Sequence, residues 1–185
     1  MSNTLPQYVQ RNIIIDGNIG SGKSTVISNL ISNGHLSIAE DVDKWAPYLK
    51  QFYGDMKLYS LSFQMKILQH HMLNAHTAYD TKIKKIHPYK IVERSPLSCI
   101  HVFGQNLLNN NYISKLDLDL MVDYNHSFGW NAKQVIYIKT DPETCFNRIN
   151  ERMRPGESIP LSYLQDIDKL YNNLYTVIDN NNNVE

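Results

Sequence analysis

Short apolar runs alternate with longer segments of helical period along this chain, a pattern typical of α/β proteins. The short runs are rich in β-branched residues and end at polar residues or glycine, as buried strands do. We expect them to form a five-stranded parallel sheet, doubly wound, with helices on both faces. The predicted strands cover residues 12–16, 36–39, 89–92, 134–139 and 175–178.

The segments between the strands carry apolar residues three and four positions apart, as helices with one buried face do. The longest such segment begins at Asp55, which is placed to cap it. Another begins at Asp141, where a capping residue precedes a proline at the first helical position. The predicted helices cover residues 23–33, 43–53 (interrupted by Pro47), 55–85, 96–108, 114–128, 141–152 and 160–171.

A chain of 185 residues is long enough to bury the core of one domain, and neither a repeat nor a linker divides it. We therefore interpret residues 1–185 as a single domain. The polar ends, residues 1–10 and 180–185, are expected to be flexible.

A phosphate-binding pattern, G-x-x-x-x-G-K-[ST], lies directly after the first predicted strand and before the first predicted helix. Its glycines let backbone amides surround a phosphate, and the following helix adds its positive dipole end. Lys23 is expected to reach the β- and γ-phosphates, and the Ser24 hydroxyl to bind Mg²⁺. The structural alternative is a simple glycine-rich turn. The predicted nucleotide-binding residues are Gly17, Asn18, Ile19, Gly20, Ser21, Gly22, Lys23, Ser24 and Thr25.

Charge and cysteine content narrow the class of protein. Lysine plus arginine equals aspartate plus glutamate at 18 each, which does not favour binding to nucleic acid or to a membrane surface. Two distant cysteines, Cys99 and Cys145, do not form a disulfide framework or a zinc site. Without a signal segment or an apolar run of membrane-spanning length, the protein is expected in the cytoplasm.

Polar residues follow three of the predicted strands: the phosphate-binding loop after the first, Glu40 after the second and Glu93-Arg94 after the third. Because the carboxyl ends of parallel strands share one edge of the sheet, these groups are expected to converge. A guanine-reading Asn-Lys-x-Asp is absent, which argues against a switch GTPase. The third strand does not end in Asp-Glu, which argues against a motor ATPase. A small-molecule kinase remains.

Five motifs in order resemble the deoxyribonucleoside kinase family, which includes deoxycytidine, deoxyguanosine and mitochondrial thymidine kinases and the broad-range insect enzyme. The resemblance covers about residues 12–179, with Asp41 where the family has proline and a lid one residue shorter. The motifs are Gly17–Thr25, Glu40–Trp45, Phe63-Gln64, Glu93-Arg94-Ser95 and Arg152–Leu164.

The resemblance implies a P-loop kinase fold with a short basic lid, ATP and Mg²⁺ as cofactors, and a homodimer. The reaction it implies is phosphorylation of a deoxynucleoside 5′-hydroxyl, for which Glu40 is the candidate proton acceptor. Arg94 is expected to hold the 5′-oxygen or a phosphate, and Glu93 to bind Mg²⁺. A solvated turn acid and a structural Glu–Arg pair are the alternatives. The lid arginines expected to neutralise the transferring phosphoryl group are Arg148, Arg152 and Arg154.

On the acceptor side, Gln64 can present an amide to a base edge, and Phe63 or Trp45 can form an aromatic wall. By family position, Tyr53 and Glu157 would hold the sugar 3′-hydroxyl. An aromatic residue at helical spacing can also be plain core.

Two further positions bear on the choice of base. Family members that prefer deoxycytidine carry an arginine and an aspartate where this chain has His71 and Cys99. The loss of that charged pair, together with the small Cys99, leaves room for a 5-methyl group and favours thymidine, with a broad range as the other possibility. His71 could also be a packed helix residue. A nucleoside monophosphate kinase, such as a thymidylate kinase, and a nucleotide-binding regulatory module are the alternative functions.

Overall fold

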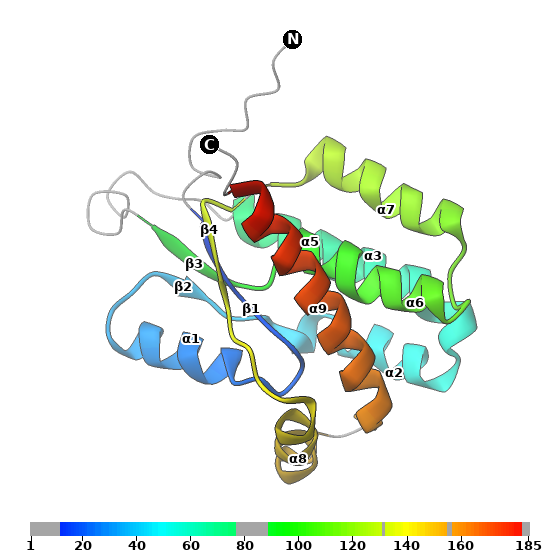
Figure 1. Cartoon of the computed structure of the whole chain (residues 1–185), viewed down its shortest axis with the longest axis horizontal. Helices are drawn as coiled ribbons and strands as arrows, with labels where there is room; N and C mark the ends of the chain where they lie inside the picture. The colour runs from blue at the N-terminus through cyan, green and yellow to red at the C-terminus, as the bar shows by residue number, and fades with distance from the viewer. Residues whose placement is uncertain (1–11, 77–88, 131, 155–156, 183–185) are drawn as a thin grey trace.

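Four parallel strands form one sheet in the order β2-β3-β1-β4 (Figure 1). The coordinates are a computed structural model that describes residues 12–76, 89–130, 132–154 and 157–182, without the side chains of residues 75–76 and 177–182. The strands are β1 (Asn12–Asp16), β2 (Ser37–Ile38), β3 (Lys90–Glu93) and β4 (Gln134–Tyr137).

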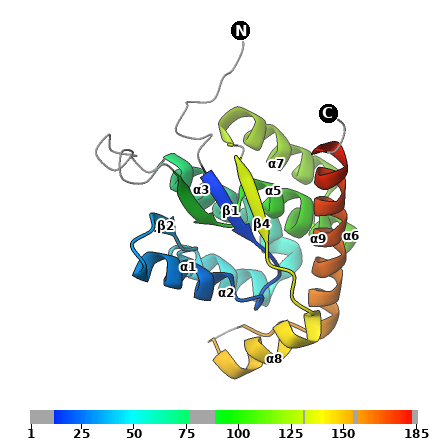
Figure 2. The ribbon, with the colours of Figure 1, turned by 60° about the vertical axis from the view of Figure 1, so that its left-hand side comes forward.

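The central strand β1 is nearly all buried because it has a parallel neighbour on each side. Ile14 pairs with Val92 of β3 and with Val135 of β4, so their side chains share one face of the sheet. The edge strand β4 alternates between exposed and half-buried positions. All strands run in the same direction, so their carboxyl ends meet at one edge, where the helix α8 (Pro142–Arg152) also lies (Figure 2).

Helices cover both faces, as a doubly wound sheet requires. The helix α1 (Lys23–Ser32) packs on one face against β1, β2 and β3, and α9 (Leu161–Asn182) lies on the other side of β1 (Figures 1 and 2). The other helical elements of the described residues are a 3₁₀ turn η2 (Val42–Lys44), α2 (Ala46–Gly54), α3 (Met56–His76), α5 (Pro96–Ser98), a π-helix η3 (Cys99–Gly104), α6 (Gln105–Asn109) and α7 (Lys115–Phe128).

Local capping explains where several of these helices begin. The Asp55 carboxylate accepts a hydrogen bond of 3.0 Å from the Leu58 amide at the start of α3. Ser114 and Asp117 form a reciprocal capping box at α7. The Asp141 carboxylate accepts hydrogen bonds from the first turn of α8, which confirms the predicted start of that helix.

The largest apolar core lies among the helices α2, α3, η3 and α7, beside the sheet. Its buried members include Phe52, Phe63, Leu68, Ile100 and Met121. A smaller cluster joins η3 to α9. Burial of these apolar side chains is the main stabilising contribution to the fold.

The expected fifth strand is wrong. Residues 175–178 lie inside α9, which continues to Asn182 instead of ending at Tyr171. Residues 180–182 therefore belong to a helix, whereas residues 1–10 and 183–185 lie outside the described residues. The α3 helix ends at His76, and the rest of its predicted length, residues 77–85, also lies outside them.

Two other helices differ in detail from the expectation. Pro47 lies in the first turn of α2, where a missing amide costs nothing, and does not interrupt the helix. The segment 96–108 is helical, but its middle winds as the π-helix η3.

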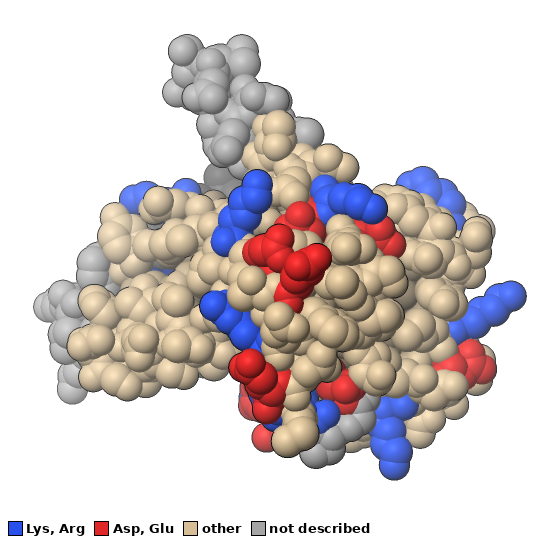
Figure 3. All heavy atoms as spheres, turned by 60° about the horizontal axis from the view of Figure 1, so that its bottom comes forward, with Lys and Arg blue, Asp and Glu red and all other residues tan. Residues whose placement is uncertain are grey.

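Acidic and basic side chains lie next to one another at the carboxyl edge of the strands (Figure 3). That mixture agrees with the balanced charge of the sequence. Within the described residues, no helix combines the length and the apolar character that crossing a membrane would require.

Candidate functional site

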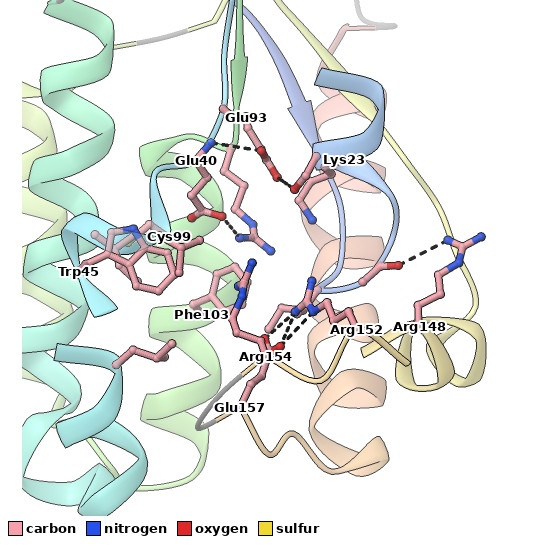
Figure 4. Close-up of a pocket in the computed structure, with 18 of the residues that line it drawn as sticks. Lys23, Glu40, Trp45, Glu93, Cys99, Phe103, Arg148, Arg152, Arg154 and Glu157 are labelled. Carbon is pink, nitrogen blue, oxygen red and sulfur yellow. Dashed lines mark hydrogen bonds and ion pairs between the residues drawn. The ribbon is translucent and has the colours of Figure 1, made fainter. Parts of the chain in front are cut away.

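A cavity of about 660 Å³ opens at the carboxyl ends of the strands (Figure 4). The three strand-end clusters converge there: Lys23 from the phosphate-binding loop, Glu40 after β2, and Glu93 and Arg94 at the end of β3. Other lining residues come from α2, α3, η3 and the lid. The sequence-predicted residues that line it are Ile19, Gly20, Gly22, Lys23, Ser24, Thr25, Glu40, Trp45, Tyr53, Phe63, Gln64, Glu93, Arg94, Cys99, Arg148, Arg152, Arg154 and Glu157.

The phosphate-binding loop follows β1 and requires glycine at specific positions. A Cβ atom on Gly17 would lie 2.6 Å from the carbonyl oxygen of Ile138, and one on Gly20 would lie 2.7 Å from that of Cys145. Gly22 has a φ of 101°, which L side chains rarely adopt. Gly17, Asn18 and Ser21 belong to the same loop but are not among the residues that line the cavity. The backbone therefore has the tight curl that a triphosphate needs.

Lys23 opens α1 and is buried beneath the loop. Its ammonium group donates hydrogen bonds to the carbonyl oxygens of Gly17 (3.0 Å) and Asn18 (2.6 Å). Burial, reinforced by the nearby Arg94 and opposed by Glu93, lowers the pKa of Lys23 to about 7. The charge of this lysine is thus sensitive to any anion placed beside it.

Glu93 joins the phosphate-binding loop to the end of β2. Its Oε1 accepts a hydrogen bond of 2.9 Å from the Ser24 hydroxyl, and its Oε2 accepts one of 3.2 Å from the Glu40 amide. A hydroxyl and a carboxylate at the phosphate end of the cavity are ligands that Mg²⁺ accepts, together with water and phosphate oxygens. Ser24 and Glu93 are therefore a suitable donor set for that ion.

Glu40 and Arg94 form an ion pair inside the cavity. Arg94 Nη1 lies 2.5 Å from Glu40 Oε2, and the two side chains are only 11% and 7% exposed, respectively. Burial disfavours the charged guanidinium, but Glu40, Tyr171, Glu93 and Asp16 together outweigh that effect, and the pKa of Arg94 is raised. Arg94 has a φ of 60°, and its guanidinium faces the Phe103 ring with 5.2 Å to the ring centre. The carboxylate of Glu40 is thus held in place by a permanent cation.

Asp41, which stands where the family motif has proline, points away from this pair. Its carboxylate lies 3.1 Å from the Lys44 ammonium, and both side chains are largely exposed. This ion pair is at the surface, so the substitution leaves Glu40 and Arg94 in contact.

Aromatic rings from α2, α3 and the junction between η2 and α2 form one wall of the cavity. The Trp45 ring packs edge to face on Phe63, with centres 5.8 Å apart, and Phe52 stacks on Phe63 at 4.8 Å. Trp45 and Phe63, which the sequence predicts as an aromatic wall, are thus buried in the same stack of rings. They also belong to the main core, which confirms the core interpretation of Phe63, and both rings line the cavity.

Gln64, Cys99 and His71 lie deeper in the cavity, all nearly fully buried. The Cys99 thiol donates to the Gln64 side-chain oxygen at 3.4 Å, and burial raises the pKa of that thiol. Burial lowers the pKa of His71 to about 3, so its imidazole is neutral at physiological pH. Among the described residues, neither ring nitrogen of His71 has a hydrogen-bond partner.

The lid, which corresponds to the motif Arg152–Leu164, contributes a further group of residues to the cavity. Arg152 donates several hydrogen bonds of 2.6–3.0 Å to the Glu157 carboxylate, in a forked geometry that fixes both side chains. Arg148 Nη1 lies 3.4 Å from two carbonyl oxygens of the phosphate-binding loop, and Arg154 also lines the cavity. Burial and the neighbouring Glu157 raise the pKa of Tyr53 to about 12.

Several residues of this region were not predicted from the sequence, among them Phe103, Tyr163 and Asp16. Phe103 and Tyr163 line the cavity, from η3 and α9. Asp16 lies directly behind the loop and accepts a hydrogen bond of 2.8 Å from the Gly17 amide. The position of Asp16 immediately before the glycine-rich loop was a signal that could have identified it.

A glycine-rich phosphate cradle, a buried lysine and an acid–arginine pair at the next strand ends define a P-loop phosphotransferase. A family model described as deoxynucleoside kinase matches residues 13–184, and the chain belongs to that family. It is therefore a deoxynucleoside kinase, and the enzymes of this family use ATP as the phosphate donor. This removes a regulatory module without turnover from the candidate functions.

Several curated proteins are similar over most of the chain. "Putative kinase protein 143R" of Invertebrate iridescent virus 6 is 32% identical over 184 residues, which cover 94% of this chain and 90% of that protein. Mitochondrial thymidine kinase 2 of Homo sapiens is 28% identical over 173 residues, 86% of this chain and 62% of that protein. Deoxycytidine kinase of Bos taurus is 26% identical over 187 residues, 85% of this chain and 72% of that protein. The names of the last two relatives specify different bases.

Proposed function

We propose that this chain transfers the γ-phosphoryl group of ATP to the 5′-hydroxyl of thymidine, with Mg²⁺, giving the 5′-monophosphate. The observation that carries the proposal is the Glu40–Arg94 ion pair, which lies in the same cavity as Lys23. An acceptor hydroxyl beside that pair would stand between a carboxylate and the phosphate-binding loop. Positioning and charge neutralisation supply most of the catalysis in phosphoryl transfer.

In this mechanism, the Glu40 carboxylate takes the proton from the 5′-hydroxyl as the phosphoryl group arrives. Arg94 keeps that carboxylate oriented and holds the attacking oxygen. Lys23 and the lid arginines Arg152 and Arg154 neutralise charge on the transferring group. Ser24 and Glu93 would hold Mg²⁺, which offsets negative charge on the phosphates when bound.

The preference for thymidine is inferred from the deep end of the cavity. The Gln64 amide can pair with the base edge, and the aromatic wall of Trp45 and Phe63 offers a face to stack on. Cys99 is small and forms no ion pair with His71, whose imidazole is neutral. These features suit an uncharged pyrimidine edge that carries a 5-methyl group.

A panel of the four deoxynucleosides, deoxyuridine and thymidine monophosphate tests this proposal, with ATP as donor. We expect thymidine to have the highest kcat/KM, about tenfold above deoxyuridine, because one methyl group in an apolar pocket contributes about that much. Cys99→Val adds bulk where the methyl group would lie and should bring that ratio close to one. Cys99→Ala keeps the space and should preserve it. Equal rates for thymidine and deoxyuridine in the parent enzyme, or a faster reaction with the monophosphate, would contradict the proposal.

We also propose that two copies of the chain pair through α7, in the homodimer that the family resemblance implies. Leu116, Leu120 and Phe128 follow one face of that helix and are 79%, 50% and 59% exposed. Exposed apolar stripes of this kind are typical of interfaces. Sedimentation should show a dimer, and the double substitution Leu116→Lys/Leu120→Lys should yield a folded monomer. Ile31→Lys, on the exposed side of α1, is the matched control and should remain dimeric; a monomeric parent would refute the pairing.

A further inference from the structure

Asp16 ends β1 and is completely buried directly before the phosphate-binding loop. Its carboxylate accepts three hydrogen bonds of 2.8 Å: Gly17 N–H and the Tyr171 hydroxyl donate to Oδ1, and the Tyr175 hydroxyl donates to Oδ2. Hydrogen bonds to a charged carboxylate are stronger than those between neutral groups. Asp16 therefore connects the first amide of the loop to two side chains of α9.

Packing fixes the positions of the two tyrosine rings. Tyr171 and Tyr175 lie one helical turn apart, and their rings are nearly parallel, at 10° with centres 6.1 Å apart. The Tyr137 ring of β4 packs on both of them, and the Phe103 ring packs edge to face on Tyr171. The hydroxyl groups are thus presented to Asp16 by rings that have little freedom to move.

A second connection joins α9 to the same loop. The Asn18 side-chain amide donates a hydrogen bond of 2.9 Å to the Leu164 carbonyl oxygen, and its Oδ1 accepts one of 2.8 Å from the Ile19 amide. Residues 16–18 are therefore held by α9 at two points about two helical turns apart. The crowding at Gly17 leaves this part of the loop little room for another position.

Tyr171 also lies close to the acceptor side of the cavity. Phe103, which contacts Tyr171, is the ring that faces the Arg94 guanidinium. Burial and Asp16 raise the pKa of Tyr171, and the Arg94 charge opposes that increase. The Tyr171 side chain thus lies between Asp16, which supports the loop, and Arg94, which pairs with Glu40.

We propose that Tyr171 and Tyr175 are positioning residues that act through Asp16 on the phosphate-binding loop and so set the affinity for ATP. The Asp16 carboxylate accepts the hydrogen bond of the Gly17 amide, and the two tyrosine hydroxyls fix the position of that carboxylate. The inference rests on ATP as donor and on the loop as its site, and it is independent of which deoxynucleoside is accepted.

The test replaces each hydroxyl and keeps each ring, with Tyr171→Phe and Tyr175→Phe. Calorimetric titration with ATP, without nucleoside, should show a Kd about three- to tenfold higher for each variant, the net contribution of one typical hydrogen bond, because the lost bond acts on ATP only through Asp16. The KM for ATP should rise in parallel, while the KM for the best deoxynucleoside of the panel stays within about twofold. Tyr137→Phe removes a hydroxyl from the same aromatic cluster, but one that does not contact Asp16, and should leave both values unchanged.

Coupling to Asp16 distinguishes positioning from general destabilisation. Asp16→Asn should also raise the Kd for ATP, and the double variant Tyr171→Phe/Asp16→Asn should raise it by less than the product of the single effects. Unchanged ATP affinity with a lowered Tm would overturn the proposal, as would an equal rise in KM for both substrates. Failure of thymidine as a substrate would leave this titration unaffected, so the two proposals can fail separately.

Discussion

Glu40→Gln is expected to lower kcat about 10²–10⁴-fold, the range that a positioned general base contributes. The amide has almost the same shape as the carboxylate and can still accept a hydrogen bond from Arg94, but it cannot take a proton from the acceptor hydroxyl. Binding should change little, so the KM for ATP should stay within about twofold. Initial rates at saturating thymidine and ATP, with Tm as a folding check, measure the effect.

The neighbouring acid provides a matched control for that experiment. Asp41→Asn also removes one negative charge, but from a largely exposed side chain that pairs with Lys44 outside the cavity. Exposed ion pairs contribute little, so this variant should keep near-parental activity. If Glu40→Gln reacted at close to the parental rate, Glu40 would lose its role as proton acceptor, and the acid–arginine pair would be structural.

Local sequence signals were sufficient for most of the fold. The strand Asn12–Asp16 and the helix starts at Asp55 and Asp141 follow from short-range patterns that the structure retains. The last segment shows where such patterns fail. Residues 175–178 have strand-forming side chains, but Tyr171 and Tyr175 are one helical turn apart and both reach Asp16, so tertiary packing favours the helix.

The π-helix η3 had no local signal either. Gly104 ends it where a Cβ atom would lie 3.0 Å from Leu118 and 3.3 Å from Met121, so the close approach of α7 accompanies the extra winding. A single sequence contains no sign of which helix will approach that closely. The same helix carries Cys99 and Phe103 to the cavity, and only the position of Cys99 was anticipated.

The candidate site likewise contains residues that the sequence predicts and contacts that it does not. Lys23, Glu40 and Arg94 were predictable because each follows a strand, and parallel strands end at one edge. The Asp16–Tyr171 hydrogen bond was not, because its partners are 155 positions apart in sequence and meet only through packing. Chemistry at strand ends can thus be anticipated, whereas the groups that hold it in place depend on the whole fold.

Lys23→Met is expected to lower kcat about 10²–10³-fold, the cost of removing one preorganised donor to the transition-state charge. The thioether side chain is of similar length but cannot donate to the Gly17 and Asn18 carbonyl oxygens, so the Tm of the variant is measured beside its kcat as a folding check. Lys169→Met, on the exposed side of α9, removes the same charge far from the cavity and should leave kcat unchanged. A kcat within about twofold of the parent in Lys23→Met would contradict contact between this lysine and the transferring group.

Lys23 should also make ATP binding depend on pH. Its pKa of about 7 means that the free enzyme carries a neutral amine above pH 7, whereas phosphate anions favour the ammonium form. Binding should therefore take up a proton, and affinity should fall as pH rises above 7 and level off below it. The lowered pKa also costs the nucleotide-free protein stability below pH 7, a cost relieved as pH rises toward 10.5, so the Tm of the parent should rise relative to that of Lys23→Met between about pH 6 and pH 9. Calorimetry at pH 8 in buffers of different ionisation enthalpy should give an uptake approaching about one proton for the parent and none beyond that of ATP itself for Lys23→Met, since the titration of ATP is common to both. Equal proton uptake in the two proteins would mean that Lys23 is already charged before ATP binds.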